Sequence, residues 1–167
     1  MALSMYNSSV PVLRHILCSL STILKKAAEH AEAKKIDPSV LTSARLFPDM
    51  FALTRQVQIA TDQAKGCVAR LAGLAIPKFD DTETGFDELQ ARIAKTIAFL
   101  DGVKAELIDG SEENEIRFQL HERTLEYTGQ NYLNQWVLPN FYFHVTTAYN
   151  ILRHNGVEIG KKDFLAG

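Results

Sequence analysis

The sequence predicts an all-α protein built as a four-helix bundle, in an up-and-down arrangement or a variant with crossover loops. Four long stretches carry apolar residues at spacings of three and four, which places those residues on one face of a helix. The segments between them are rich in Pro, Gly, Asp and Ser. No internal repeat or long linker interrupts the 167 residues, so we expect a single domain over residues 1–167.

The first two helices follow from their apolar stripes and their breaking residues. The first is expected over residues 8–34, with Ser8 or Ser9 as N-cap and Pro11 near the first turn. A short Pro-led segment over residues 38–47 predicts a single helical turn. The second helix is expected to begin at Pro48 and to stop before Gly73. Gly66 lies inside it, where we expect close packing against a neighbouring helix.

The second half of the chain adds two helices and a small non-helical element. After a loop over residues 74–85, a third helix is expected over residues 86–108. Apolar and polar residues alternate over residues 115–127, which predicts a small two-stranded excursion before the last helix. The last helix is expected over residues 129–155, and Pro139 must kink or split it because proline lacks an N–H group.

Composition excludes several classes of protein. Hydrophobic residues make up 46% of the chain and charged residues 23%, as in ordinary globular domains. A formal net charge of −2 predicts no nucleic-acid partner. The chain contains no uninterrupted apolar stretch of about 18 residues, so we expect no membrane-spanning segment. The first residues lack the features of a secretory signal, so we expect a cytoplasmic protein. Cys18 and Cys67 provide neither a disulfide framework nor a zinc-binding spacing.

Polar residues on the inner face of the last helix indicate a candidate site. Asn140 and His144 lie one turn apart on the predicted apolar stripe, and a buried polar group without a partner costs roughly 1–3 kcal/mol. The second helix offers Gln58 and Asp62 beside its own stripe. We therefore predict a polar pocket at mid-bundle in which His144 and Asn140 face Gln58 and Asp62. The alternative is a hydrogen-bond network that only fixes the helix register.

Two stretches of the chain resemble a known family. Residues 138–165, LPNFYFHVTTAYNILRHNGVEIGKKDFL, and residues 47–60, FPDMFALTRQVQIA, are similar to an uncharacterised family that itself resembles the DinB/YfiT-like superfamily of four-helix bundles. That superfamily includes divalent-metal proteins and metal-dependent thiol transferases and isomerases. Its members usually hold the metal with three histidines, one from the second helix and two from an H-x-x-x-H pair on the last.

The resemblance implies a role for each matching position. His144 corresponds to the second histidine of the pair, and Asn140 stands where the first would be. Gln58 stands roughly where the histidine of the second helix would be, and Thr147 occupies a position where many relatives have glutamine. One of the three expected ligands is therefore present. Amide oxygens are weak ligands for zinc or nickel, which favour imidazole, thiolate and carboxylate.

Several functions follow as hypotheses. In the first, zinc or nickel is bound at His144, and the chain is a divalent-metal-dependent enzyme or a relative with a degenerate metal site. In the second, the pocket of His144, Asn140, Gln58, Asp62 and Thr147 binds a small molecule without metal, or His144 acts there as a general base. In the third, the protein is structural. We also expect a homodimer, formed through exposed members of an aromatic cluster: Trp136, Phe141, Tyr142 and Phe143.

Overall fold

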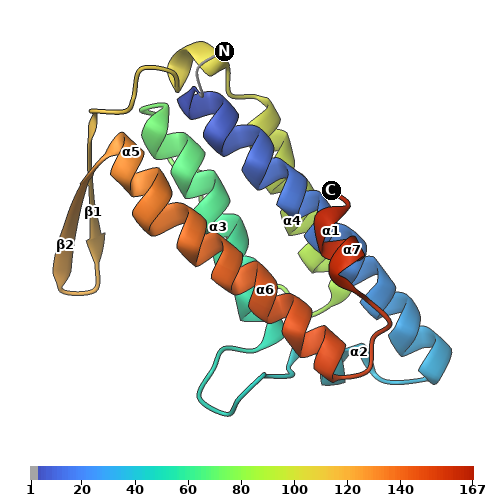
Figure 1. Ribbon diagram of the computed structural model, residues 1–167. Helices are drawn as coiled ribbons and strands as arrows, with labels where there is room; N and C mark the ends of the chain where they lie inside the picture. Colours follow the sequence, from blue (N-terminus) through green and yellow to red (C-terminus); the bar gives the residue numbers. More distant parts are fainter. Residues whose placement is uncertain (1–3) are drawn as a thin grey trace.

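Four long helices form the body of the protein, and a short hairpin projects from one end (Figure 1). The structure is a computed structural model that describes residues 4–167. The long helices are α1 (Met5–Lys34), α3 (Leu53–Leu71), α4 (Phe86–Asp101) and α6 (Leu138–His154). The short helical segments are α2 (Pro38–Thr42), η1 (Ala105–Leu107), α5 (Gly129–Asn131), η2 (Tyr132–Val137) and α7 (Lys161–Leu165). The strands are β1 (Glu115–Leu120) and β2 (Arg123–Thr128).

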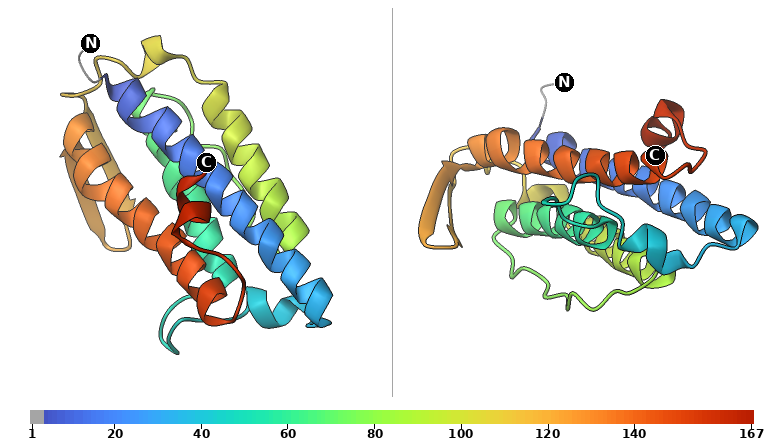
Figure 2. Two further views of the ribbon diagram at one scale, coloured as in Figure 1. Left: turned by 45° about the vertical axis from the view of Figure 1, so that its right-hand side comes forward. Right: turned by 90° about the horizontal axis from the view of Figure 1, so that it is seen from below.

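The bundle contains a crossover connection. Helices α1 and α6 run in one direction and α3 and α4 in the other, as the colours of Figure 1 show. Because α3 and α4 are parallel neighbours, the chain between them must return along the length of the bundle. Residues 74–85 make this return as a loop without regular structure (Figure 2). The predicted all-α bundle with a crossover loop is thus confirmed.

The apolar stripes of the four helices meet in one core. Helix α3 packs against both α6 and α4, and α1 packs against α4. The largest fully buried side chains come from all four long helices, from α2 and from η2, and they include Leu13, Leu17, Leu20, Leu41, Leu53, Leu89, Ile93, Tyr132 and Phe141. None of the helices formed by residues 4–167 is both long enough and apolar enough to cross a membrane.

The first helix begins earlier than its capping pattern predicts. The N-cap is Ser4, whose side chain accepts a hydrogen bond from the Asn7 backbone N–H at 3.2 Å. Ser9 is instead buried inside the helix and donates to the carbonyl of Met5. The prediction of an N-cap at Ser8 or Ser9 was therefore wrong. The first turn buries Met5, and this packing extends the helix past Pro11 although proline removes one helical hydrogen bond.

The second and third helices are shorter than predicted. Residues 43–52, the 43–52 loop, form a closed turn in which Leu53 N–H donates to the Ala44 carbonyl at 2.9 Å. The side chain of Arg45 donates to the Met50 carbonyl within the same loop. The second helix therefore begins at Leu53 and not at Pro48. The third helix ends at Asp101, where Gly102 follows, and the rest of the predicted helix contains the single 3₁₀ turn η1.

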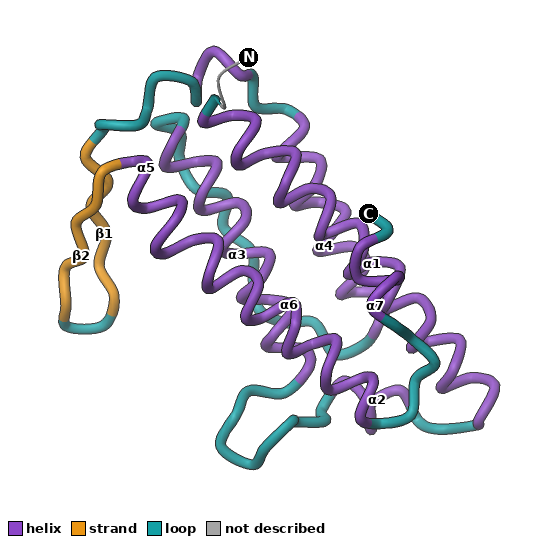
Figure 3. Tube along the Cα trace, in the orientation of Figure 1, coloured by secondary structure: helices purple, strands orange, loops and turns teal. Residues whose placement is uncertain are grey.

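The predicted hairpin is present (Figure 3). The predicted break in the last helix is present as a change from the π-helical segment η2 to the α-helix α6. Strands β1 and β2 pair antiparallel with Ile116 opposite Tyr127 and Leu120 opposite Arg123. Thr128 caps α5 by accepting a hydrogen bond from the Asn131 N–H. The π-helical segment η2 precedes Pro139, which lies in the first turn of α6, so the helix changes its winding where the proline N–H is missing.

Candidate functional site

His144 lies on the flank of α6 that faces α3, and it is half-buried between the two helices. Its Nδ1 atom lies 2.7 Å from Oε1 of Gln56, a side chain that is 1% exposed. The two residues are 88 positions apart in the chain, so the packing of α3 on α6 creates this contact. A half-buried imidazole and a buried amide thus satisfy each other's hydrogen-bonding groups.

The second hydrogen bond of Gln56 determines which imidazole nitrogen carries the proton. Its Nε2 donates to the backbone carbonyl of Phe51 at 3.0 Å, which turns its Oε1 toward His144. An amide oxygen only accepts hydrogen bonds, so Nδ1 of His144 must be the donor. The lone pair of the neutral ring is therefore on Nε2. Nε2 makes no hydrogen bond with any residue in the range 4–167. It is not one of the buried, unpaired side-chain polar atoms of that range.

The surroundings of the ring keep it uncharged. Burial lowers the pKa of the His144 imidazole from 6.5 to about 4, and the positive charge of nearby Arg55 acts in the same direction. At neutral pH the ring is consequently neutral, with a proton on Nδ1 and an acceptor lone pair on Nε2. A histidine whose one nitrogen is held in this way presents the other with a defined direction.

Asn140 and Thr147 share the flank of His144, one turn on either side of it. Their side chains, however, bond to their own helix. Asn140 Nδ2 donates to the Trp136 carbonyl at 2.6 Å, and Thr147 Oγ1 donates to the Phe143 carbonyl at 2.7 Å. Such bonds to the preceding turn satisfy the side chains without a partner from another element. Neither residue contributes a hydrogen bond to His144.

Gln58 and Asp62 lie on a different face of α3 from Gln56. Gln58 Nε2 donates to Glu83 Oε2 at 2.8 Å, and Asp62 Oδ1 accepts from Lys65 and from Arg92 at 2.7 and 2.8 Å. The predicted contact of His144 with Gln58 is therefore replaced by the contact with Gln56. The reason is helical geometry: two residues turn the side-chain direction by about 200°, so Gln56 and Gln58 face different neighbours.

Arg92 is the centre of the polar cluster to which Gln58 and Asp62 belong. Its guanidinium, 1% exposed, reaches Asp62, Asp81 and Glu83 at 2.8, 3.0 and 3.0 Å. Burial lowers the pKa of Arg92, but its hydrogen bond to Glu83 and the charges of the three carboxylates outweigh this and raise it. Two of the carboxylates belong to the 74–85 loop, so Arg92 fastens this loop to α3 and α4.

Two residues of the site, Gln56 and Arg55, were not predicted. A signal for Gln56 was available, because Leu53, Gln56 and Ala60 follow the spacings of three and four that define the buried face. Arg55 gives no such signal, since an exposed arginine beside a buried stripe is ordinary in a helix. Its place near His144 depends on how α3 packs against α6.

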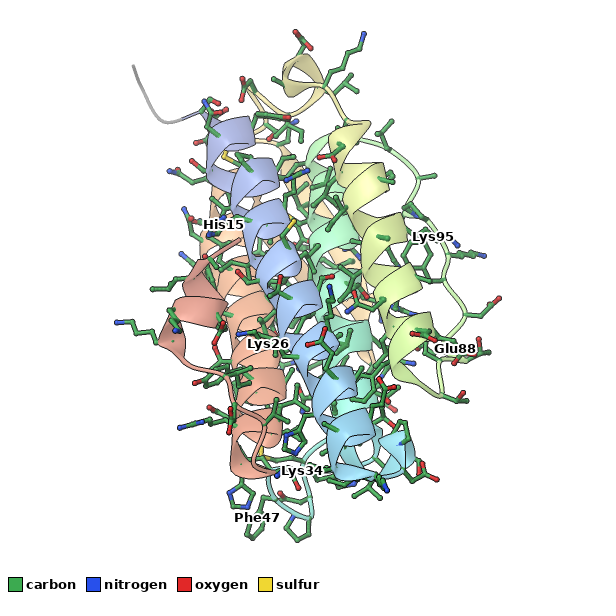
Figure 4. The ribbon with its side chains drawn as sticks, turned by 90° about the vertical axis from the view of Figure 1, so that its right-hand side faces the viewer. His15, Lys26, Lys34, Phe47, Glu88 and Lys95 are labelled. Atoms are coloured by element: carbon green, nitrogen blue, oxygen red, sulfur yellow. The ribbon has the colours of Figure 1, made fainter. Side chains whose placement is uncertain are left out.

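Exposed aromatic side chains come from α6 and from the 43–52 loop. The Phe143 ring meets the His144 ring edge-on, with centroids 5.3 Å apart. Phe143, Phe47 and Phe51 are 56%, 63% and 54% exposed. Figure 4 shows Phe47 at the end of the molecule, pointing away from the bundle. A shallow cavity of about 400 Å³ lies between the 43–52 loop and α6, lined by Leu46, Met50, Tyr142, Phe143, Thr146, Thr147 and Asn150.

The donors around His144 do not fit a three-histidine metal centre. Within residues 4–167, no group of three or more His, Cys, Asp or Glu side chains is arranged to hold a metal ion. The side chains that accompany His144 are the amides Gln56 and Asn140, and both are engaged in hydrogen bonds. Zinc and nickel favour imidazole, thiolate and carboxylate over neutral amides. Cys67 is fully buried, which raises the pKa of its thiol to about 12.

Comparison with known proteins identifies a family and a solved structure that are similar to this chain. Residues 5–165 match the family described as "Domain of unknown function (DUF1993)". The crystal structure of a DinB family member protein from Shewanella denitrificans is similar to this chain, with 43% sequence identity and a TM-score of 0.87. The alignment covers 97% of this chain and 92% of that one. No curated protein matches the sequence.

Proposed function

The chain belongs to the DUF1993 family of DinB-like proteins, and from this premise we propose that it carries a degenerate metal site that binds a small polar molecule without metal. In this function His144 is the retained member of the three-histidine set. Its Nε2 atom accepts a hydrogen bond, or a proton, from the bound molecule. The observation that carries the proposal is the 2.7 Å contact between His144 Nδ1 and Gln56 Oε1.

The chemistry of this contact supports a base or hydrogen-bond acceptor. A carboxylate partner on Nδ1 would stabilise the charged imidazolium, whereas a neutral amide does so less. The amide of Gln56 holds one tautomer and leaves the ring neutral, which is the form that accepts a proton. A pKa of about 4 makes the ring a weak base, so hydrogen-bond acceptance is the main role and proton transfer requires an acidic partner.

The same contact supports a degenerate form of the superfamily site. Gln56 is the residue of α3 whose side chain contacts the retained histidine, so we take it as the counterpart of the ligand from the second long helix. Asn140 precedes His144 by four residues, as the first histidine of an H-x-x-x-H pair would. Replacement of both by amides removes two strong ligands and retains groups that form hydrogen bonds.

Restoring the two ligands tests this assignment. We expect the double variant Gln56→His/Asn140→His to bind about one equivalent of zinc or nickel, because it presents three imidazoles at the contact point of α3 and α6. The matched control is Gln58→His/Asn140→His, in which the new α3 histidine faces Glu83 instead. Equilibrium dialysis followed by metal analysis measures both, beside the wild type.

Two outcomes would contradict the proposal. Stoichiometric zinc or nickel in the wild type, lost in His144→Ala, would instead favour the metal-dependent enzyme. Equal metal binding by the two double variants would show that Gln56 does not occupy the ligand position. A ¹⁵N NMR spectrum of the His144 ring is an independent check, and we expect the proton on Nδ1 and none on Nε2 at pH 7.

A homodimer stays a prediction. Of the four aromatic residues that suggested it, Phe141 is fully buried and Trp136 and Tyr142 are half-buried, which leaves Phe143 on the surface. Sedimentation velocity is the test. A dimer that Phe143→Ser converts to monomers supports this interface, and a wild type that sediments as an 18.7 kDa monomer contradicts it.

A further inference from the structure

The 74–85 loop contacts the bundle through polar groups and one aromatic ring. None of residues 74–85 is buried, and none belongs to the apolar core or packs against it. The loop contacts α3 and α4 through the carboxylates of Asp81 and Glu83 and through the Phe79 ring. Figure 2 shows the loop running outside the two helices that it connects. Segments with few buried apolar contacts are the ones that open most easily in a folded protein.

The surface beneath the loop is polar as well. The Lys65 side chain of α3 is 7% exposed, and its Nζ atom lies 4.4 Å from the centroid of the Phe79 ring. A cavity of about 320 Å³ lies between the loop and α4, and its lining includes Phe79, Glu83, Arg92 and Lys95. Removal of the loop from this surface therefore exposes charged groups and does not open the apolar core.

Arg92 keeps partners on the bundle when the loop leaves. Its Nε donates to Thr61 Oγ1 at 2.7 Å and its Nη2 to Asp62 Oδ1 at 2.8 Å, and both acceptors belong to α3. The carboxylates of Asp81 and Glu83 contact a different atom, Nη1, at 3.0 Å each. On detachment these two carboxylates pass into water. No buried charge is left without a partner, which is the situation that costs most when an ion pair is broken.

The loop is long enough to move outward without unwinding a helix. It must return along α4, whose 16 residues extend over about 24 Å. Residues 74–85 can span about 40 Å when extended. This excess allows the middle of the loop to leave the bundle while the ends of α3 and α4 stay in place.

We propose that the 74–85 loop is a detachable strap, in which Phe79, Asp81 and Glu83 leave the α3–α4 face together while the four long helices stay folded. In the attached state the loop covers a cationic face that consists of Arg55, Lys65, Arg92 and Lys95. The attachment is electrostatic, so neutralising the two carboxylates or screening them with salt releases the loop. This inference does not depend on binding at His144.

Limited trypsin digestion followed by mass spectrometry measures the release. Lys78 is an exposed trypsin site within the loop, and Arg123 in the exposed hairpin is the internal standard. We expect Asp81→Asn/Glu83→Gln to raise the ratio of the two cleavage rates about tenfold in favour of the loop, because cleavage follows the population of the open form. Raising the salt concentration from about 0.05 M to about 1 M should raise the ratio in the wild type but not in this variant.

The matched control is Asp80→Asn/Glu122→Gln, which removes the same total charge. Asp80 is bonded to Arg92 through its backbone carbonyl, and Glu122 lies at the exposed tip of the hairpin. Neither carboxylate fastens the loop, so the cleavage ratio should change by less than about twofold. Equal acceleration in the control would show that general charge, and not the contacts of Asp81 and Glu83, decides the release.

Amine labelling of Lys65 tests whether the loop leaves as one unit. The Lys65 ammonium contacts the Phe79 ring, so it becomes fully accessible only when this ring leaves as well. We expect its labelling rate, measured by mass spectrometry, to rise about tenfold in Asp81→Asn/Glu83→Gln. Lys25, which is exposed on α1, is the reference and should be labelled at an unchanged rate.

The results that would overturn the proposal are distinct. Cleavage after Lys78 that is as fast in the wild type as in Asp81→Asn/Glu83→Gln would show that the carboxylates do not fasten the loop. Faster cleavage with Lys65 still protected would show that the loop frays near Lys78 and does not leave as a unit. Should the double variant lose its helical circular dichroism signal, the salt series on the wild type decides. An unchanged cleavage ratio in that series overturns the proposal.

Discussion

The partner of a histidine decides its charge, and at His144 the partner is an amide. Gln56 accepts the Nδ1 proton but adds no negative charge to favour the imidazolium. Burial and the field of Arg55 then both act against protonation, so the pKa is about 4. At neutral pH the His144 ring is therefore uncharged and can accept a hydrogen bond.

This assignment makes the stability of the protein depend on pH through His144. Its pKa is near the ordinary 6.5 in the unfolded chain and about 4 in the folded protein, so between these values the unfolded state binds the extra proton. The contribution of the neutral ring is complete above pH 6.5 and is lost as the pH falls toward 4. At about 1.4 kcal/mol per unit, and allowing for partial exposure, the loss is about 2–3 kcal/mol.

Comparison with His144→Gln isolates the effect from the carboxylates. We expect the difference in unfolding free energy between wild type and variant to shrink by about 2–3 kcal/mol from pH 7 to pH 4. Urea denaturation at a series of pH values measures it, and NMR titration of the ring gives the pKa directly. Parallel stability curves for the two proteins, or a ring that titrates near pH 6.5, would refute the assignment.

The sequence predicted that His144 lies on the inner flank of its helix, but it did not predict which residues surround the ring. Periodicity placed His144 on the inner flank because the spacing along a helix needs no knowledge of its neighbours. Choosing Gln56 over Gln58 required the rotation of α3 about its axis, and that rotation is set by packing against two helices at once. Arg55 and Asp81 meet only because a loop returns along the bundle, which no local pattern encodes.

At the scale of the elements, two glycines lie at positions where an added Cβ would meet nearby atoms. Gly129, the first residue of α5, lies so near the carbonyl of Ser111 that an added Cβ would be 2.0 Å from its oxygen. This contact joins the start of the last helical region to the chain before β1. Gly66 shows a different cause. An added Cβ there would meet Nη1 of Arg70 on the same helix at 2.8 Å, so the predicted close packing against a neighbouring helix was wrong.

The contact at Gly129 predicts a steric cost for any side chain. Gly129→Ala should lower the free energy of unfolding by about 1–3 kcal/mol, because backbone atoms must shift to admit the methyl group. Gly102→Ala is the matched control, since Gly102 has φ −79° and an added Cβ meets only ordinary contacts of 3.5 Å. We expect that substitution to be neutral or stabilising. Chemical denaturation measures both, and equal effects at the two glycines would contradict the steric explanation.

The type of a helix or strand could be predicted where its apolar pattern extended over many residues. The residues at which helices begin could not be predicted in the same way. The four long helices, the hairpin and the stop at Gly73 follow the predicted order, and Gly73 and Gly156, which come shortly after α3 and α6, both adopt positive φ. The wrong starts at Ser8 and Pro48 have tertiary causes. Packing of Met5 carries α1 past Pro11, and the closed 43–52 loop delays α3 until Leu53.

Over the whole molecule, polar contacts hold the return connection between two parallel helices. The 74–85 loop has no secondary structure, and its side chains bind the bundle largely through charge. Asp81 and Glu83 bind Arg92, and the Phe79 ring lies 4.3 Å from the Lys95 ammonium. Figure 4 shows Lys95 on the side of α4 along which this loop runs. The loop also carries Asp81, the carboxylate that binds Arg55, so α3 contributes a second arginine contact to its attachment.

Arg92 is the buried cation on which this attachment depends. Arg92→Met should lower the free energy of unfolding by about 3–5 kcal/mol, because Asp62, Asp81 and Glu83 lose their shared partner and repel one another. Hydrogen exchange over residues 74–85 should accelerate more than exchange in α1. Lys95→Met is the control, since it removes a cation that contacts the same loop from the solvent side, and it should cost less than about 1 kcal/mol.

The cost of Arg92→Met has two parts, which a third variant separates. If repulsion among unpartnered carboxylates dominates, then adding Asp62→Asn and Glu83→Gln to Arg92→Met should recover part of the lost stability. If the arginine acts mainly by filling space, the added substitutions bring no recovery, and the electrostatic explanation is wrong. Recovery of stability without recovery of slow exchange in the 74–85 loop would show that Arg92 fastens the loop as well as neutralising it.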